Sequence, residues 1–361
     1  MTKLIFFALS ALLITGIALV KYTSFSCCGI SNALSVDNAN VLLASTATPE
    51  RPIGDKTNII ASPDNPTELG DVHWLRDIET GRTQAKATGK PLLILFQEVP
   101  GCSNCTRFGS GPLRHPLIVE AIETWFVPVC IYNNKGGKDA EALRQFNEPA
   151  WNNPVVRIVD TANRELAARM AEFGSSARLV TTIVQAIAQQ KATVPEYLKL
   201  LQEELIAREA GLETATFSMY CFWSGEGTLG AVPGVVETEP GFQDGREVVR
   251  VLFNPAVVQK SAIEAIAQPK GITTCARNDG FRSDREPKYY LSQTDYRFLP
   301  MTSLQAGRAN SLTGNGQPPE GLFSPRQLAL LKKITQQPEK KWKNIVGDKD
   351  LVSAWNLVNK K

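Results

Sequence analysis

PLLILFQEVPGCSNC, residues 91–105, decides the fold of the first half of the chain. Its first six residues are apolar, which is typical of a short strand buried on both faces of a sheet. A loop follows over residues 97–101, and a Cys-x-x-Cys pair then runs from Cys102 to Cys105. This order predicts that the first cysteine lies where a helix begins.

A thiol at a helix N-terminus is chemically distinctive. Unpaired N–H groups and the positive end of the helix dipole lower the pKa of such a thiol. Cys102 is therefore predicted to be the attacking thiol, and Cys105, one turn later, the resolving thiol. A structural disulfide and half of a zinc site are the alternatives. Because no second cysteine pair at zinc spacing follows, no metal is predicted.

The flanking sequence alternates helical and strand patterns. Helices are predicted at 76–89, 116–125, 139–146, 177–190 and 195–210, and strands at 126–132 and 155–159. Such alternation indicates an α/β sheet covered on both faces. Cys130 lies inside one apolar strand and is interpreted as a core residue. Asn153-Pro154 precedes the last strand, and an X-Pro bond can adopt the cis form at a cost of only ~0.5–1 kcal/mol.

These features resemble the thioredoxin superfamily over about residues 71–190. The run Val-Pro-Gly-Cys-Ser-Asn-Cys, residues 99–105, is similar to thioredoxin-like (seleno)proteins with a Val-Pro-Gly-Sec-x-x-Thr signature. Cys102 falls at the selenocysteine position and Cys105 at the threonine position. The resemblance implies a reversible disulfide beside a cis proline, Pro154. The Trp-Cys-Gly-Pro-Cys run of thioredoxin is absent, so no particular redox partner is implied.

After residue 211 a second series of strand and helix patterns begins. Strands are predicted at 214–220, 235–239 and 247–253, with a turn at 241–245 and a helix at 255–267. Beyond residue 271 the chain is polar and loop-rich until a helix near 325–335. We expect this second half to be an α+β domain.

The second half contains YCFWSGE at residues 220–226, which resembles the Gly-Cys-Phe-Trp-Gly-x-Glu signature of methionine sulfoxide reductase A. The resemblance continues at 232–235, 241–245 and 247–255. It implies that Cys221 attacks the sulfoxide sulfur and that Glu247, in an apolar pocket that keeps it protonated, is the acid. Phe222 and Trp223 would form the hydrophobic wall of the substrate site. Cys275 is the candidate resolving thiol.

The chain departs from that family at two places. Tyr220 replaces the glycine before the cysteine, and Phe242 stands where the family has a tyrosine that binds the sulfoxide oxygen. Loss of such a donor can cost ~10²-fold in rate. Tyr296, within residues 293–297, is the predicted replacement donor. The alternative is an inert cysteine at a core strand-to-helix junction.

The N-terminal residues predict export. Lys3 precedes an uncharged run at residues 4–20, which would span about 26 Å as a helix, slightly less than a ~30 Å hydrocarbon core. A signal peptide or membrane anchor (1–26), a flexible linker (27–70), a thioredoxin-like domain (71–211) and a reductase-like domain with a C-terminal extension (212–361) are predicted. The domains would be membrane-anchored or exported to an extracytoplasmic space such as the periplasm.

Composition limits the function classes. A net charge of +3 in 361 residues does not indicate nucleic-acid binding. Seven cysteines, two of them Cys27 and Cys28 at the export boundary, leave at least one thiol unpaired. His73 and His115 lack ligand-like neighbours and are interpreted as structural.

We therefore expect an oxidoreductase without a cofactor that reduces methionine-(S)-sulfoxide, free or in oxidised protein. The cysteine pair would serve as internal reductant, replenished by an external thiol donor. One alternative is a thiol–disulfide oxidoreductase with a degenerate second domain. The other is a second domain that only binds oxidised peptides.

Overall fold

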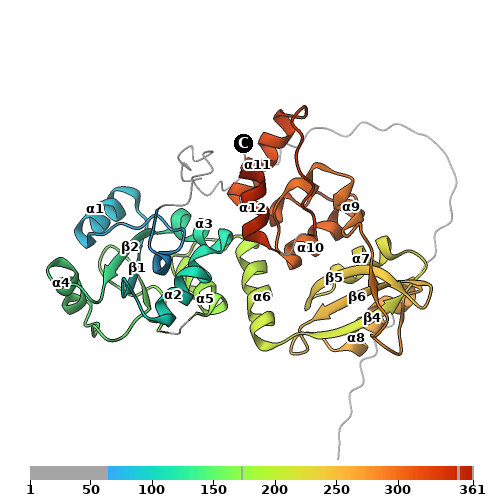
Figure 1. Ribbon diagram of the computed structural model, residues 1–361, viewed down its shortest axis with the longest axis horizontal. Coiled ribbons are helices and arrows are strands. Elements are labelled where there is room, and N and C mark those ends of the chain that lie inside the picture. The colour runs from blue at the N-terminus through green and yellow to red at the C-terminus, as the bar shows by residue number, and fades with distance from the viewer. Residues whose placement is uncertain (1–63, 172–173, 348–349, 360–361) are drawn as a thin grey trace, which may run out of the picture. The chain divides into compact units, whose positions relative to one another are not determined.

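The apolar run of residues 92–97 forms the central strand of the first sheet. The computed structural model describes residues 64–171, 174–347 and 350–359, all within one compact unit of the chain, Pro52–Lys361. β1 (Leu92–Gln97) pairs in parallel with β2 (Val127–Tyr132) and antiparallel with β3 (Val155–Val159) (Figure 1). Because every β1 residue is buried, the expected two-sided burial is confirmed.

Helices cover both faces of this sheet. Leu93 and Leu95 belong to one apolar cluster, and the alternating residues Leu92, Ile94 and Phe96 belong to another. The helices of this half are α1 (Ile78–Thr88), α2 (Ser103–Ser110), α3 (Pro116–Trp125), α4 (Lys138–Gln145), α5 (Ser176–Gln189) and α6 (Glu196–Ala210). Short 3₁₀ helices are η1 (Thr67–Leu69) and η2 (Pro112–Arg114). Cys130 is fully buried in β2, as predicted, and burial raises its pKa to about 12.

The second sheet is antiparallel, with strand order β7-β4-β6-β5-β8. Its strands are β4 (Glu213–Ser218), β5 (Val235–Gln243), β6 (Arg246–Phe253), β7 (Thr273–Thr274) and β8 (Arg282–Ser283). The helices of this half are α7 (Phe222–Gly230), α8 (Lys260–Ala267), α9 (Tyr289–Ser292), α10 (Ser303–Gly314), α11 (Pro325–Gln336) and α12 (Leu351–Asn359), with η3 (Gln268–Lys270), η4 (Asp295–Phe298) and η5 (Glu320–Leu322). An α+β arrangement was expected here.

Several predicted boundaries were wrong. The chain between β5 and β6 turns over Asp244 and Gly245 alone, so β5 is longer than predicted. α8 begins at Lys260 rather than Pro255, because the Asn254 side chain accepts a hydrogen bond from Ala256 N and holds a turn there. α10 occupies a segment predicted as loop. The predicted flexible linker reaches residue 70, whereas Thr67–Leu69 form η1 with Leu69 buried in the core.

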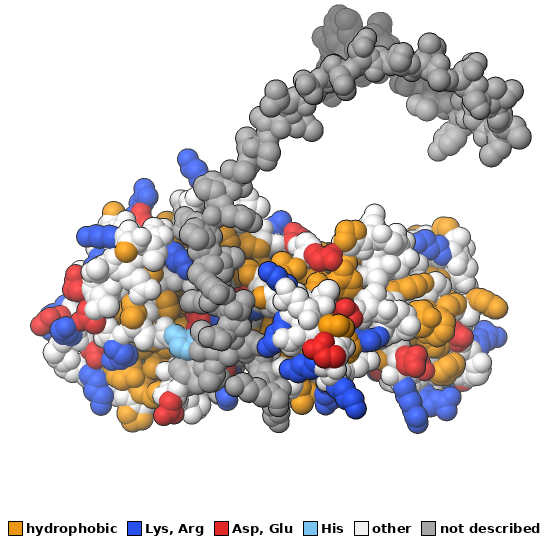
Figure 2. All heavy atoms as spheres, turned by 90° about the horizontal axis from the view of Figure 1, so that it is seen from above, with side chains coloured by type: hydrophobic (Ala, Val, Ile, Leu, Met, Phe, Trp, Pro, Cys, Tyr) orange, Lys and Arg blue, Asp and Glu red, His pale blue; other side chains and the backbone are white. Residues whose placement is uncertain are grey.

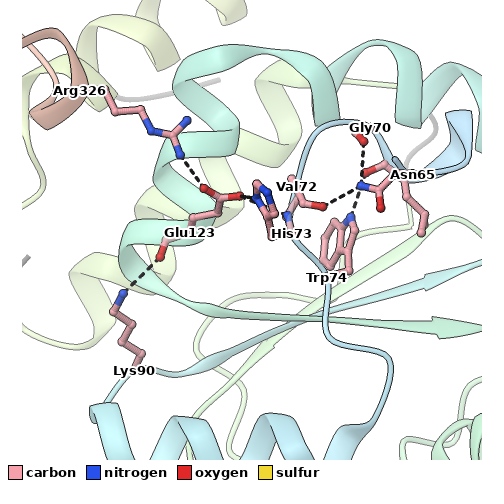
Figure 3. A network of polar contacts seen from close by, with 9 residues as sticks. Asn65, Gly70, Val72, His73, Trp74, Lys90, Glu123 and Arg326 are labelled. Atoms are coloured by element: carbon pink, nitrogen blue, oxygen red, sulfur yellow. Dashed lines mark hydrogen bonds and ion pairs between the residues drawn. The ribbon is translucent and has the colours of Figure 1, made fainter. Parts of the chain in front are cut away.

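One apolar cluster joins α3, α5 and α6 to the helices after residue 288. It includes Leu198 and Leu201 of α6 together with Leu291, Leu330 and Trp355. Polar contacts reinforce it: Glu123 of α3 accepts hydrogen bonds from His73 Nδ1 at 2.6 Å and from Arg326 of α11 at 2.5 Å (Figure 3). The first-half helices and the C-terminal helices therefore share a continuous core.

The surface carries charges of both signs. On the face drawn in Figure 2, lysine and arginine side chains lie among aspartate and glutamate side chains. Among the described residues, no helix is long and apolar enough to cross a membrane. The predicted export segment at residues 4–20, together with Cys27 and Cys28, lies outside the described residues.

Candidate active sites

The first site is the cysteine pair at the start of α2. Cys102 is the exposed N-cap residue of this helix, and its carbonyl accepts the first helical hydrogen bond, from Thr106 N. The backbone N–H of Cys105 and, more weakly, that of Asn104 point to the Cys102 sulfur and lower the pKa of its thiol. The two sulfur atoms are 3.7 Å apart. Cys102 is therefore accessible and stabilised as a thiolate, and Cys105 is close enough to form a disulfide with it after a small movement.

Cys105 is the protected member of the pair. Its thiol is buried, and burial raises its pKa to about 11. The thiol donates to Asn153 Oδ1 at 2.8 Å, directly before the cis Asn153–Pro154 bond. The structure thus brings the predicted cis proline segment to the cysteine pair. A second cis bond, Val99–Pro100, precedes the pair and was not predicted.

Two side chains that the motif did not reveal support the loop before Cys102. Gln97 Nε2 donates to Glu68 O at 2.7 Å and to Cys105 O at 3.1 Å. The Glu68 carboxylate accepts a hydrogen bond from Gly101 N at 2.8 Å. Gly101 has no room for a side chain, since a Cβ there would lie 2.3 Å from Glu98 O and 2.6 Å from Cys105 Cβ. No sequence signal linked Glu68 to the cysteine pair, because the contact spans more than thirty residues.

The site could also present ligands to a thiophilic ion. Ligand atoms of Glu98, Cys102 and Cys105 lie within 4.8 Å of one another. Thiolate and carboxylate groups suit Zn²⁺, although a structural zinc site has four protein ligands and this group offers three. The arrangement fits thiol–disulfide exchange at least as well as it fits zinc binding.

The opposite pKa shifts predict selective alkylation. Lowering the pKa of Cys102 increases its thiolate fraction at pH 7, whereas the Cys105 pKa of about 11 leaves that thiol protonated. We expect iodoacetamide at pH 7 to modify Cys102 much faster than Cys105, with the difference shrinking as the pH approaches 11. Peptide mass spectrometry after timed quenching measures both rates. Equal rates at pH 7 would contradict this assignment.

The second site is built at the start of α7. Cys221 is the N-cap residue of this helix and is partly exposed, while the preceding Tyr220 is 97 % exposed. Glu247 of β6 accepts a hydrogen bond from Phe222 N on its Oε2 at 2.8 Å, and its carbonyl accepts one from Met219 N. The carboxylate of the predicted acid is therefore bound to the backbone N–H of the residue that follows the predicted nucleophile.

Aromatic rings enclose this helix start. Phe222 packs edge-on against Phe242, with ring centroids 5.5 Å apart, and against Trp223 at 6.1 Å. Trp223 stacks on Tyr289 at 3.7 Å, with the ring planes 9° apart. Such a wall suits the thioether and methyl group of a methionine side chain. The predicted residues Phe222, Trp223 and Phe242 are thus brought together, and Tyr289 joins them without having been predicted.

Two other predicted residues lie elsewhere. The Tyr296 hydroxyl donates to Glu320, and its ring packs on Phe323, so the predicted donor already has a hydrogen-bond acceptor. Cys275 N donates to Thr216 O, opposite the middle of β4. The strand remains extended to Met219, about 10 Å further at ~3.3 Å per residue, and Cys221 follows. Cys275 therefore lies beside the middle of β4, and its role as resolving thiol stays a prediction.

Comparison with known proteins finds a thioredoxin-like region in the first half of the chain. A thioredoxin-like family model matches residues 73–161. Residues 73–161 form a thioredoxin-like domain. A solved structure described as a DsbH oxidoreductase is 19% identical, covers 36% of this chain and 93% of its own, and has a TM-score of 0.29.

The chain also has weak similarity to methionine sulfoxide reductase A. Peptide methionine sulfoxide reductase MsrA of Methanoculleus marisnigri is 37% identical over 75 residues, or 16% of this chain and 46% of that protein. The Methanococcus maripaludis C5 protein of the same name is 36% identical over 64 residues, or 13% and 41%. The chain thus spans less than half the length of these relatives. The thioredoxin-like match and the partial MsrA similarity support a thiol-redox role.

Proposed function

We propose that the protein reduces methionine-(S)-sulfoxide, free or in oxidised proteins, at Cys221. The observation that carries this proposal is the joint placement of Cys221 at the N-terminus of α7, Glu247 beside it and an aromatic wall around it. Cys221 is partly exposed, so a substrate can reach its sulfur, which is the nucleophile that sulfoxide reduction requires. The similarity to MsrA proteins over part of the chain agrees with this chemistry.

The reaction balances as follows. The Cys221 thiolate attacks the sulfoxide sulfur, the S–O bond of the substrate breaks as the oxygen becomes bonded to the Cys221 sulfur, and one proton, supplied through Glu247, is taken up. The products are methionine and a sulfenic acid on Cys221. The Cys102 thiolate, on a second molecule or brought to Cys221 by movement of the two halves, then displaces hydroxide from that sulfenic acid and forms a mixed disulfide. Cys105 attacks Cys102, which releases Cys221 as a thiolate and leaves a Cys102–Cys105 disulfide for an external dithiol to reduce.

The compartment is part of the same proposal. The uncharged run at residues 4–20, preceded by Lys3, supports export of the domains to an extracytoplasmic space, with or without retention of a membrane anchor. Disulfide chemistry is common in such compartments. The external thiol donor would then have to be supplied outside the cytoplasm.

A turnover assay with dithiothreitol tests the proposal. Dithiothreitol can reduce Cys221 directly, so the full chain should convert a methionine sulfoxide peptide to the methionine peptide without help from the first site. Cys221→Ser should reduce the rate to background, and Cys102→Ser should retain it. Thiol exchange that depends on Cys102 but comes without sulfoxide turnover would favour a thiol–disulfide oxidoreductase instead. Binding of the sulfoxide peptide without turnover would indicate a recognition domain.

A further inference from the structure

We propose that Trp151 of one molecule docks against Tyr220 of a second copy when the Cys102–Cys105 pair reduces oxidised Cys221. This inference rests on the proposed function and names the surface on which its thiol exchange takes place. A mixed disulfide joins two sulfur atoms ~2 Å apart, so the surfaces around Cys102 and Cys221 must come into direct contact. Side chains that project beside the two sulfur atoms are therefore the first to meet the partner.

Two exposed aromatic rings flank these sites. Among the large apolar side chains of the described residues, Trp151 and Tyr220 are the most exposed, at 82 % and 97 %. Tyr220 directly precedes Cys221, at the position where the methionine sulfoxide reductase A signature has glycine. The ring is thus an addition to the motif that supplies the nucleophile. Tryptophan and tyrosine are the residue types that most often dominate the binding energy of protein interfaces.

A turn holds Trp151 beside the cysteine pair. Asn152 N donates to Pro149 O at 3.1 Å, which closes the turn around Trp151. Asn153, two residues after Trp151, accepts the hydrogen bond of the Cys105 thiol on its Oδ1 at 2.8 Å. Because two residues of chain span at most ~7 Å, the Trp151 backbone lies at the edge of the first site. A partner that reaches the cysteine pair therefore meets this ring.

The charges at the two sites are complementary. A carboxylate oxygen of Glu98 lies within 4.8 Å of both sulfur atoms of the cysteine pair. At the second site, the exposed Arg282 of β8 places its guanidinium 5.6 Å from the ring centroid of Phe242. Phe242 in turn packs against Phe222, the residue after Cys221. An acidic group at one site and a basic group at the other favour the encounter of two copies in this orientation.

The contact requires a second molecule. Rings that are 82 % and 97 % exposed do not pack against each other in this structure. Movement within one chain is opposed by buried hydrogen bonds: Glu120 of α3 accepts one from Ser324 Oγ at 2.7 Å, and Glu204 of α6 accepts one from Leu304 N of α10 at 2.9 Å. α10 itself packs against α7, which presents Cys221. Each buried group left unpaired would cost ~1–3 kcal/mol, whereas two copies can meet without that loss.

A mixture of two full-length variants tests this contact. The Cys102→Ser/Cys105→Ser protein supplies Cys221, the Cys221→Ser protein supplies the cysteine pair, and both carry Cys27→Ser and Cys28→Ser. With excess methionine sulfoxide and no external reductant, the first alone should form about one equivalent of methionine and the second alone none. Mixed in equal amounts after reduction, they should form about two equivalents per Cys221. The second equivalent should appear faster as the protein concentration rises.

Substitution of either ring should slow only this second equivalent. Trp151→Ala in the partner that supplies the cysteine pair, or Tyr220→Gly in the partner that supplies Cys221, should slow it about tenfold, as for an interface hot spot. The two changes together should be no slower than the slower single change, because either one already breaks the contact. Val257→Ala is the control: this exposed side chain lies beyond the opposite end of β6 and should affect neither equivalent.

Circular dichroism checks that each variant is folded. A mixture that stops at one equivalent, while the unmodified protein reaches two, would show that the relay stays within one chain and would overturn this inference alone. A second equivalent unaffected by Trp151→Ala or by Tyr220→Gly would also overturn it. A slower first equivalent in Tyr220→Gly would place that ring in the sulfoxide site instead of the docking surface. No methionine from the unmodified protein would overturn the proposed function as well.

Discussion

Replacing Lys288 with methionine should lower the free energy of unfolding by about 3–5 kcal/mol. Glu226 is fully buried and accepts hydrogen bonds from Lys288 through both of its oxygens. Removal of the ammonium leaves the carboxylate without its counter-charge in the interior, and that penalty exceeds the loss of the pair's own attraction. Because this pair also anchors the start of α9, sulfoxide turnover should decline as well.

Urea unfolding followed by circular dichroism measures this effect. Lys199→Met is the matched control, since it removes the same charge from an exposed pair with Glu196, and it should change the stability by less than about 1 kcal/mol. The double variant Lys288→Met/Glu226→Leu should recover part of the loss, because it removes the stranded carboxylate. Equal destabilisation by Lys288→Met and Lys199→Met would show that the buried pair has no special role.

Fully reduced protein without external reductant should convert two equivalents of methionine sulfoxide per chain. Attack by Cys221 consumes the first sulfoxide and leaves a sulfenic acid. Electrons from Cys102 and Cys105 return Cys221 to the thiolate, which then reduces a second sulfoxide. The variant Cys102→Ser/Cys105→Ser should stop after about one equivalent, so the relay doubles the yield.

Quantitative amino-acid analysis after desalting provides this count. Cys27→Ser and Cys28→Ser should be present in every variant, so that these thiols do not contribute electrons. Cys275→Ser should leave the yield at two equivalents, because oxidised Cys221 accounts for one sulfoxide whether it is a sulfenic acid or a disulfide with a second thiol. A yield of one equivalent from protein with an intact Cys102–Cys105 pair would exclude the relay.

Local patterns predicted much of the first half. The apolar run of β1, the helix start at Cys102 and the proline before β3 are each set by neighbouring residues, and the structure places them as expected. The thiol chemistry of Cys102 follows from the backbone N–H groups at the start of α2. Glu68 supports the loop before Cys102 by accepting a hydrogen bond from Gly101 N. This role could not be predicted, because Glu68 is distant in the sequence and lies in a segment that resembles a linker.

In the second half, the recognised motifs located Cys221, Glu247 and the first aromatic residues but missed α9 and α10. α10 contains Gly307 and Gly314, which are weak helix formers, so it depends on the Thr302 N-cap and on packing against α7. Tyr289 of α9 stacks on Trp223 of α7, and Tyr290 packs beside Gly227 of α7 and Gly314 of α10, through tertiary contacts that no local pattern reveals. For this reason the sequence did not assign Tyr289 to the aromatic wall.

The methionine yield of reduced Cys221→Ser protein tests the central claim most directly. This variant retains the Cys102–Cys105 pair as a source of electrons and lacks only the sulfur proposed to attack the sulfoxide. Our account predicts that it forms no methionine above the protein-free control, while the parent protein forms two equivalents per chain. Formation of one or more equivalents by Cys221→Ser would contradict the account.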